Sequence, residues 1–445
     1  MKFPFWPEMS GYRNIEFGLK RVYDLLERIG NPHLNLPPVI HAAGTNGKGS
    51  TLAFLQAILE ENNYLVHKYI SPHLVNFNER IVIAGKEIED DFLNECLLIC
   101  KKASEKSPKI AVTYFEGITV AAFLAFSLKK ADILLLETGM GGELDATNVL
   151  SQVLCSIITP ISFDHQGFLG NSIEQIASAK AGIIKKNCSV VSIQNDEKAL
   201  EVITKTAKNL NSPLKIIKNN KDNFQNCDFL IKNEENSQFW HLIDKNSQER
   251  YVFLKPNLIG DHQLQNASLA IVALLSQKYF KINQSLISKA LSKAQWPARL
   301  QKIYSGKFYQ KLPKNCEIYL DGSHNIAGAE TIDDFLSKQK GKKIIVIMAM
   351  LNDKDCSQFI KVIASKIDFF ISCEIFDEEK SLKSQEIAKI AKERGVLNVK
   401  ISQNLEQVFK IITEQEINED YLVLVCGSLY FAGEFLLKNY NNSIN

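Results

Sequence analysis

The segment His41–Thr51, HAAGTNGKGST, restricts the possible folds of this chain more than any other part of its sequence. It follows an apolar stretch, Pro38–His41, and leads into a helical pattern, Thr51–Glu60. A strand, a glycine-rich turn with a lysine and a hydroxyl, and then a helix can surround phosphate groups with backbone N–H groups. The spacing departs from GxxxxGK[ST], because two residues separate the first two glycines and a third glycine follows the lysine. The predicted ATP- or GTP-binding residues here are Gly44, Thr45, Asn46, Gly47, Lys48, Gly49, Ser50 and Thr51.

The wider pattern predicts an α/β protein with two domains, because 445 residues are too many for one core. Apolar strand-like runs alternate with helix-like runs, which favours a parallel sheet covered on both faces. Residues 1–295 are predicted to form an N-terminal P-loop ATPase domain. Within it, the Asn-, Lys- and Gln-rich residues 188–255 are predicted to form a small, mostly β appendage. A second alternation predicts a Rossmann-like α/β domain at residues 296–445.

Composition argues against several functional classes. The net charge of +2 gives no electrostatic reason to expect a nucleic-acid or membrane partner. The nine cysteines contain no CxxC pair, so buried free thiols are expected rather than zinc ligands or disulfides. The first 14 residues do not have the pattern of a secretory signal, and no uncharged apolar stretch is long enough to span a membrane. A cytoplasmic protein is therefore expected.

Polar residues follow two apolar strand-like runs. Ile133–Leu136 leads into Glu137 and a glycine cluster, which is a suitable place for a carboxylate that holds Mg²⁺ against ATP. Glu143 and Asp145 lie in the same loop and are expected to be solvated. His165 follows the second run, Val153–Thr159, so a second cation site is predicted near this histidine.

Lys180 lies on the apolar face of a helix that is predicted to begin at a capping box, Ser172 with Gln175. A lysine directed inward has a lowered pKa, and its neutral amine could capture CO₂ as a carbamate. Spacing alone favours the alternative in which the side chain snorkels to water.

Three further segments are candidate ligand contacts. Gln263 and Asn266 are spaced i, i+3 at the start of a helix, where they could bind an adenine or a phosphate, although capping explains Asn266 nearly as well. Asp321–Asn325 follows an apolar run in the second domain. Arg299, in the joint between the domains, could contact phosphate in bidentate fashion.

Taken together, these motifs resemble the folylpolyglutamate synthase branch of the Mur-type amide ligases. The matching segments run through most of the chain, and His262-Gln263 favours this branch over the peptidoglycan ligases. The departures are mild, among them Ala298 where glycine is common. The matching segments are Ile40–Ser50, Ser71–Leu74, Glu79–Ile81, Glu137–Asn148, Ser162–His165, Ala179–Lys185, His262–Ala267, Trp296–Leu300, Asp321–Asn325, Met350-Leu351 with Asp353–Asp355, and Gly427–Tyr430.

The resemblance implies an ATP-dependent carboxylate–amine ligase that adds L-glutamate to dihydropteroate and to reduced folates through an acyl phosphate. It implies two Mg²⁺ sites, a carbamylated Lys180 and a monomer. The implied catalytic residues are Lys48, His165 and Lys180, and the implied metal ligands are Ser50, Ser71, Glu137, His165 and Lys180. The implied ATP contacts outside the glycine-rich loop are Gln263, Asn266, Arg299, Asp321 and His324. The implied folate and glutamate contacts are Ser71, His73, Arg80, Ser323 and His324.

Three other functions stay open from the sequence. One is a folylpolyglutamate synthase without the dihydrofolate step, and a second is another Mur-type ligase. The third is a GTP-hydrolysing switch, although no N-K-x-D motif follows a recognisable strand.

Overall fold

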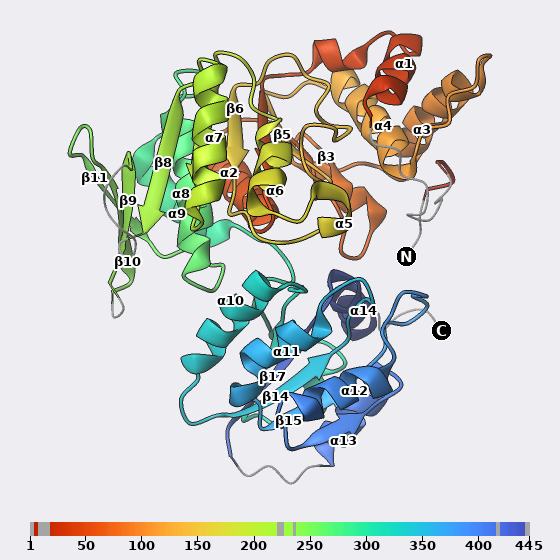
Figure 1. Cartoon of the computed structure of the whole chain (residues 1–445), viewed down its shortest axis with the longest axis vertical. Helices are drawn as coiled ribbons and strands as arrows, with labels where there is room; N and C mark the ends of the chain where they lie inside the picture. Colours follow the sequence, from red (N-terminus) through yellow and green to blue (C-terminus); the bar gives the residue numbers. More distant parts are fainter. Residues whose placement is uncertain (1–3, 8–17, 220–226, 235–236, 415–418, 441–445) are drawn as a thin grey trace. The chain divides into compact units, whose positions relative to one another are not determined.

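The computed structural model describes residues 4–7, 18–219, 227–234, 237–414 and 419–440 (Figure 1). Most of the N-terminal stretch in which no secretory signal was expected lies outside the described residues. The chain divides into two compact units. Unit 1 is Met1–Asn257 with Asp261–Gln295, and unit 2 is Leu258–Gly260 with Trp296–Asn445.

Unit 1 is built on an 11-stranded sheet whose order is β11-β10-β9-β8-β7-β6-β1-β5-β2-β3-β4. The strands from β9 to β2 in that order run parallel, and the strands beyond them at both ends pair antiparallel. The strands are β1 Val39–Ala43, β2 Val66–Tyr69, β3 Ile81–Ile83, β4 Lys86–Glu87, β5 Ile133–Glu137, β6 Cys155–Ile158, β7 Ser189–Ile193, β8 Leu214–Asn219, β9 Phe229–Asn233, β10 Phe239–Asp244 and β11 Arg250–Leu254.

The central strands β1, β5 and β6 are buried along their whole length, because helices cover both faces of the sheet. One face packs against α1, α3, α4, α6 and α7, and α2, α8 and α9 pack together on the other. The helices are α1 Lys20–Arg28, α2 Lys48–Glu61, α3 Asp90–Glu105, α4 Tyr114–Leu128, α5 Gln166–Leu169, α6 Ile173–Ala181, α7 Glu197–Asn209, α8 His262–Leu275 and α9 Ile287–Lys293, with 3-10 turns η2 Pro32–Asn35, η3 Phe77–Arg80 and η4 Gln284–Leu286.

The prediction that residues 188–255 form a small, mostly β appendage is wrong in one respect. β7, α7 and β8 continue the parallel sheet of unit 1, and only β9, β10 and β11 form an antiparallel extension. Ala199, Ile203 and Ala207 are buried at four-residue spacing on α7. The polar composition of the segment hid this helical period, because those polar residues lie on the outer face of the helix.

Unit 2 contains a six-stranded sheet in the order β12-β13-β17-β14-β15-β16. Its strands are parallel except for the edge strand β12. The strands are β12 Gln301–Ile303, β13 Cys316–Leu320, β14 Lys343–Met348, β15 Phe369–Ser372, β16 Val399–Ile401 and β17 Tyr421–Cys426. The helices are α10 Ile326–Ser337, α11 Cys356–Ile363, α12 Ser384–Glu393, α13 Leu405–Thr413 and α14 Leu429–Tyr440, with η5 Tyr309–Lys311 and η6 Ala364–Lys366. The predicted α/β fold class is confirmed in both units.

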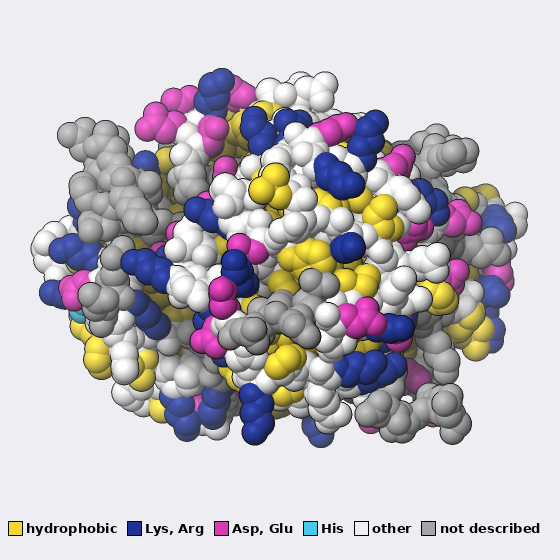
Figure 2. Space-filling model, turned by 90° about the horizontal axis from the view of Figure 1, so that it is seen from below, with side chains coloured by type: hydrophobic (Ala, Val, Ile, Leu, Met, Phe, Trp, Pro, Cys, Tyr) yellow, Lys and Arg dark blue, Asp and Glu magenta, His cyan; other side chains and the backbone are white. Residues whose placement is uncertain are grey.

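Surface and cysteine chemistry follow the composition. All nine cysteines are free, and eight of them are buried. On the face drawn in Figure 2, basic and acidic side chains are interspersed. No helix of the described chain combines the length and apolar character needed to cross a bilayer.

Candidate active site

The predicted phosphate loop joins β1 to α2. Gly44 and Gly47 have φ values of 149° and 89°, which favour glycine. The N–H groups of Thr45 and Asn46 donate to Pro160 O, at 3.0 and 3.3 Å, so they are already used within the protein. The first N–H groups of a helix have no partner within it, and in α2 these belong to Lys48, Gly49 and Ser50. The N–H groups that lack a helical partner and so suit an anion are therefore those at the start of α2.

Both glycines are also needed because neighbouring atoms approach them closely. A Cβ at Gly44 would lie 1.8 Å from Thr159 Oγ1, and a Cβ at Gly47 would lie 2.3 Å from Asn266 Oδ1. Asn266 donates through Nδ2 to Gln263 Oε1 at 3.0 Å, and both amides are buried on α8. Since α8 begins at His262, Asn266 lies inside the helix and is not its cap. The structure thus brings this amide pair against the phosphate loop.

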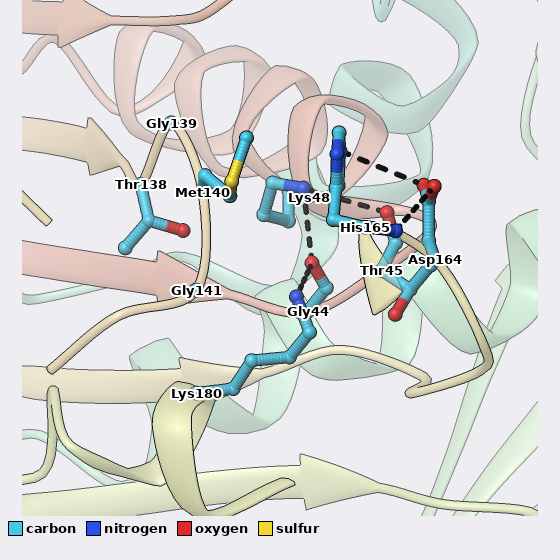
Figure 3. A pocket seen from close by; sticks show the side chains of 10 residues that line it. All are labelled: Gly44, Thr45, Lys48, Thr138, Gly139, Met140, Gly141, Asp164, His165 and Lys180. Atoms are coloured by element: carbon cyan, nitrogen blue, oxygen red, sulfur yellow. Dashed lines mark hydrogen bonds and ion pairs between the residues drawn. The ribbon is translucent and has the colours of Figure 1, made fainter. Parts of the chain in front are cut away.

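Two lysines meet at one carbonyl. Lys48 Nζ and Lys180 Nζ donate to Gly44 O at 3.0 and 2.9 Å (Figure 3). Lys180 lies on α6, which begins at the predicted Ser172–Gln175 capping box, and it is only 4% exposed. Burial, and secondly the charge of Lys48, lower the pKa of Lys180 to about 7. The interpretation that this side chain snorkels to water is therefore wrong, because the amine is directed into the site.

The predicted metal ligand Glu137 is buried at the end of β5. Its Oε2 accepts the backbone N–H of Ser71 at 3.3 Å, and its Oε1 lies 3.9 Å from Lys48 Nζ. Ser50 is buried in the first turn of α2. Glu137, Lys48 and Ser71 are thus close together in unit 1.

The loop that carries Ser71 is held by a buried arginine and a carboxylate. Arg80 donates from Nε to His73 Nδ1 at 2.8 Å and from Nη1 to Ser71 Oγ at 3.3 Å. Glu79 accepts three consecutive backbone N–H groups of the loop, those of residues 74–76. Burial, and then the Arg80 charge, lower the pKa of His73 to about 3, so this imidazole is neutral.

His165 has a φ of 51° and precedes α5. Asp164 Oδ1 accepts the His165 backbone N–H at 2.9 Å, and Asp164 Oδ2 lies 3.8 Å from His165 Nε2. Both residues line the pocket in Figure 3 together with Lys180. Asp164 was missed as a site residue, although its position beside His165 was a signal in the sequence.

The prediction that both acids after Glu137 are solvated is wrong for Asp145. Glu143 is exposed, whereas Asp145 is buried, and burial raises the pKa of its carboxyl. Asp145 accepts the N–H of Met140 at 2.8 Å and the hydroxyl of Thr147 at 2.6 Å. It therefore shapes the wall of the pocket formed by residues 138–141.

The candidate residues of unit 2 surround the end of β13. Asp321 is buried, and its two oxygens accept the N–H groups of Leu300 and Ser323, both at 2.8 Å. His324 Nδ1 lies 3.0 Å from Gly322 O, and Arg299 Nη1 donates to Ala298 O at 2.8 Å. Asp321 thus fixes the backbone of the two residues that directly follow Arg299 and Gly322.

The donor set fits a nucleotide and a hard cation. Thr51 Oγ1 and Ser162 Oγ are buried beside the phosphate loop and have no hydrogen-bond partner among the described residues. Within the part of the chain that the structure describes, no three His, Cys, Asp or Glu side chains form a group able to hold a metal. One carboxylate and nearby hydroxyls suit Mg²⁺ that is bound largely through phosphate oxygens and water.

Comparisons with known proteins agree with this geometry. The family model for the Mur ligase middle domain matches residues 42–274, and that for the dihydrofolate synthetase C-terminal domain matches residues 306–438. The chain is 33% identical to the dihydrofolate synthase/folylpolyglutamate synthase of Bacillus subtilis, with 94% of each protein covered. It is 30% identical to the dihydrofolate synthetase of Saccharomyces cerevisiae, with 97% of this chain and 99% of that protein covered.

A solved structure is similar over nearly the whole chain. It is that of the bifunctional folylpolyglutamate synthase/dihydrofolate synthase of Yersinia pestis complexed with AMPPNP and Mn ion. The TM-score is 0.82 at 25% identity, and the match covers 96% of this chain and 94% of that chain.

Proposed function

Because this chain belongs to the dihydrofolate synthase/folylpolyglutamate synthase family of Mur ligases, we propose that it joins L-glutamate to dihydropteroate and to reduced folates with ATP. The observation that carries the proposal is the convergence of Lys48, Lys180 and Glu137 on the phosphate loop. A nucleotide-binding loop with its metal-holding carboxylate would not by itself need the second, buried lysine. The Bacillus, yeast and Yersinia relatives support the reaction class by their names.

ATP would lie with its phosphates at the start of α2. There the free N–H groups of the helix and the Lys48 ammonium would hold the β- and γ-phosphates. The amides of Gln263 and Asn266 would line the same loop from α8. Arg299, Asp321 and His324 of unit 2 are proposed as the other nucleotide contacts, with Ser323 and His324 also close to the incoming glutamate.

The substrate carboxylate would attack the γ-phosphorus, so that an O–P bond forms, the bond to ADP breaks and an acyl phosphate results. The glutamate amine would then attack the acyl carbon, and inorganic phosphate would leave as the amide forms. The chain contributes chiefly positioning and positive charge, which are the main needs of phosphoryl transfer. Ser71, His73 and Arg80 are proposed to lie beside the folate carboxylate. Because His73 is neutral, it would contribute hydrogen bonds there but no charge.

Two Mg²⁺ ions are proposed. Ser50, Ser71 and Glu137 would hold the first ion, and His165 with Lys180 would hold the second. Bound Mg²⁺ would neutralise charge on the β- and γ-phosphates.

Lys180 is proposed to carry a carbamate. Its neutral amine would add to the carbon of CO₂, and a proton from nitrogen would pass to solvent, leaving an anionic oxygen ligand in place of an ammonium. Its burial and its pKa of about 7 support this reaction near neutral pH. K180A should abolish ligation while the protein stays folded, and a short carboxylic acid should restore part of the rate. K48A, which lacks a different group, should not respond to the acid. Normal activity in K180A would refute the carbamate.

The deciding experiment is mass analysis of the products formed from ATP, labelled glutamate and one acceptor at a time. Labelled dihydrofolate and glutamylated tetrahydrofolate are both expected. A product from tetrahydrofolate alone would limit the chain to folylpolyglutamate synthesis. A product from a UDP-sugar peptide alone would overturn the proposal.

A further inference from the structure

The phosphate loop is built against a second loop, residues 159–162, which follows β6 and is called here the β6 loop. Pro160 O accepts the N–H groups of Thr45 and Asn46. The Thr45 hydroxyl donates to Ser162 O at 3.0 Å and accepts the Ser162 N–H at 3.1 Å. The conformation of the phosphate loop therefore depends on where the β6 loop lies.

A buried glutamine holds the β6 loop from its other side. Gln194 follows β7 and is 3% exposed. Its Oε1 accepts the Ile161 N–H at 3.0 Å, and its Nε2 donates to Thr159 O at 2.9 Å. Nε2 also lies 3.1 Å from Ser192 Oγ and 3.2 Å from Ile158 O. The amide thus spans the β6 loop with both its donor and its acceptor.

The strand order explains how the Gln194 side chain, at the end of β7, can influence the phosphate loop through the β6 loop. β7, β6 and β1 are adjacent and parallel, so their carboxyl ends meet at one edge of the sheet. Gln194, the β6 loop and the phosphate loop follow these three strands in turn. The β6 loop also leads directly into Asp164 and His165.

We infer that Gln194 is a positioning residue for ATP, acting through the β6 loop without contacting the nucleotide. The inference rests on the proposed function, since it assumes that ATP binds at the phosphate loop. Only a neutral amide of this length satisfies the set of groups around it. A glutamate would direct a carboxylate at Thr159 O, and a methionine would leave the Ile161 N–H and Thr159 O buried without partners.

Q194M tests this inference, with S192A as its matched control. Ser192 lies on β7, donates to Ile158 O at 3.1 Å and accepts from Gln194 Nε2 at 3.1 Å, and no hydrogen bond among the described residues joins Ser192 to the β6 loop itself. In Q194M the KM for ATP should rise about tenfold or more, since small displacements of positioning groups have effects of this size. The KM for dihydropteroate should change less, and calorimetry should show the same loss of affinity for ADP. S192A should keep wild-type affinity for nucleotide even where its thermal stability falls.

A double-mutant cycle tests whether Gln194 acts on the phosphate loop through the contact between Thr45 and Ser162. T45V removes the hydroxyl that joins the phosphate loop to Ser162 but keeps the branched shape of the side chain. If Gln194 acts through this contact, Q194M and T45V will raise the KM for ATP by less together than the product of their separate effects. If the two effects on the KM for ATP multiply exactly, Gln194 does not act through the contact between Thr45 and Ser162.

Equal nucleotide affinity in Q194M and S192A would overturn the inference. If Q194M does not fold, Q194N serves instead, because it keeps an amide but withdraws it from the β6 loop. Failure of the proposed function is distinct, since wild-type protein would then neither bind ADP nor form product.

Discussion

The phosphate loop of this chain tolerates no side chain at Gly47, because Asn266 lies against it from α8. The same contact explains why an amide pair from a distant part of the sequence belongs to the site. A close packing of this kind makes the loop sensitive to a single added carbon.

G47A should therefore lose nucleotide binding. The new Cβ would meet Asn266 Oδ1, and the φ of 89° disfavours any L-residue. Calorimetry with ADP should show at least a hundredfold weaker binding, on the order of 3 kcal/mol. G167A is the control, because nothing lies within 4 Å of a Cβ there. Unchanged affinity in G47A would contradict the account of the loop.

Lys180 illustrates the opposite case, in which a side chain suited to chemistry weakens the fold. Its folded pKa of about 7 lies below its ordinary value of 10.5, so the cost to stability is fully present below pH 7 and is lost between pH 7 and about 10.5. K180M should raise the free energy of unfolding at pH 6 by about 2–3 kcal/mol while abolishing activity.

Urea denaturation at pH 6 and pH 9 checks this expectation. The gap between K180M and wild type should shrink at the higher pH. Lys186 is exposed near the end of the same segment, so K186M should leave both curves unchanged. A K180M protein less stable than wild type at pH 6 would contradict the buried, destabilising amine.

Among the secondary-structure elements, α4 shows how local and tertiary contacts act together. Thr113 and Glu116 form a capping box at its start, and Glu116 also accepts two hydrogen bonds from Arg21 of α1, at 2.8 and 3.0 Å. One carboxylate therefore begins α4 and ties α1 to it.

E116A should destabilise unit 1 by about 2–3 kcal/mol, because it removes a cap and the two charge-assisted hydrogen bonds from Arg21. E116Q, which keeps the shape and part of the hydrogen bonding, should cost less. D24A removes the exposed Lys20–Asp24 pair of α1 and should change stability by under about 0.5 kcal/mol. Equal effects of E116A and D24A in thermal denaturation would refute this role of Glu116.

The joint at the start of unit 2 is another element in which backbone conformation matters. Ala298 and Leu300 have φ values of 55° and 45°, which place both in the left-handed region on either side of Arg299. Both residues are buried, and Asp321 holds the Leu300 N–H. A glycine would adopt this conformation without strain, whereas alanine adopts it here at some cost.

For the whole molecule, three buried histidines of unit 1 contribute to the response to acid. Burial, with smaller contributions from Lys185 and Arg80 respectively, lowers the pKa values of His41 and His73 to about 3, and burial also lowers the pKa of His67. Because the unfolded state binds these protons near pH 6.5, stability is full above that pH and falls as the pH decreases.

Unit 1 should therefore lose about 2 kcal/mol per fully buried histidine between pH 7 and pH 5. H41Q should flatten this slope by about that amount, even though it lowers stability at pH 7. The comparison is I40V, which changes a fully buried residue of the same strand without a titratable group and should leave the slope unchanged. Urea denaturation at the two pH values checks this, and an unchanged slope in H41Q would contradict the assignment.

The sequence by itself determined the local elements and the chemistry of the site. The glycine-rich turn, the capping box at Ser172 and the apolar strands depend on neighbouring residues, so they were visible in the linear pattern. The α7 helix was missed because its few buried positions are surrounded by polar ones. Tertiary structure alone decided that Lys180 reaches Gly44 O, that Asp145 is buried and that Gln194 spans the β6 loop. Each of these depends on burial and on strands that are neighbours in the sheet but far apart in the chain. The local spacing of residues in the sequence indicates neither the burial nor the strand order.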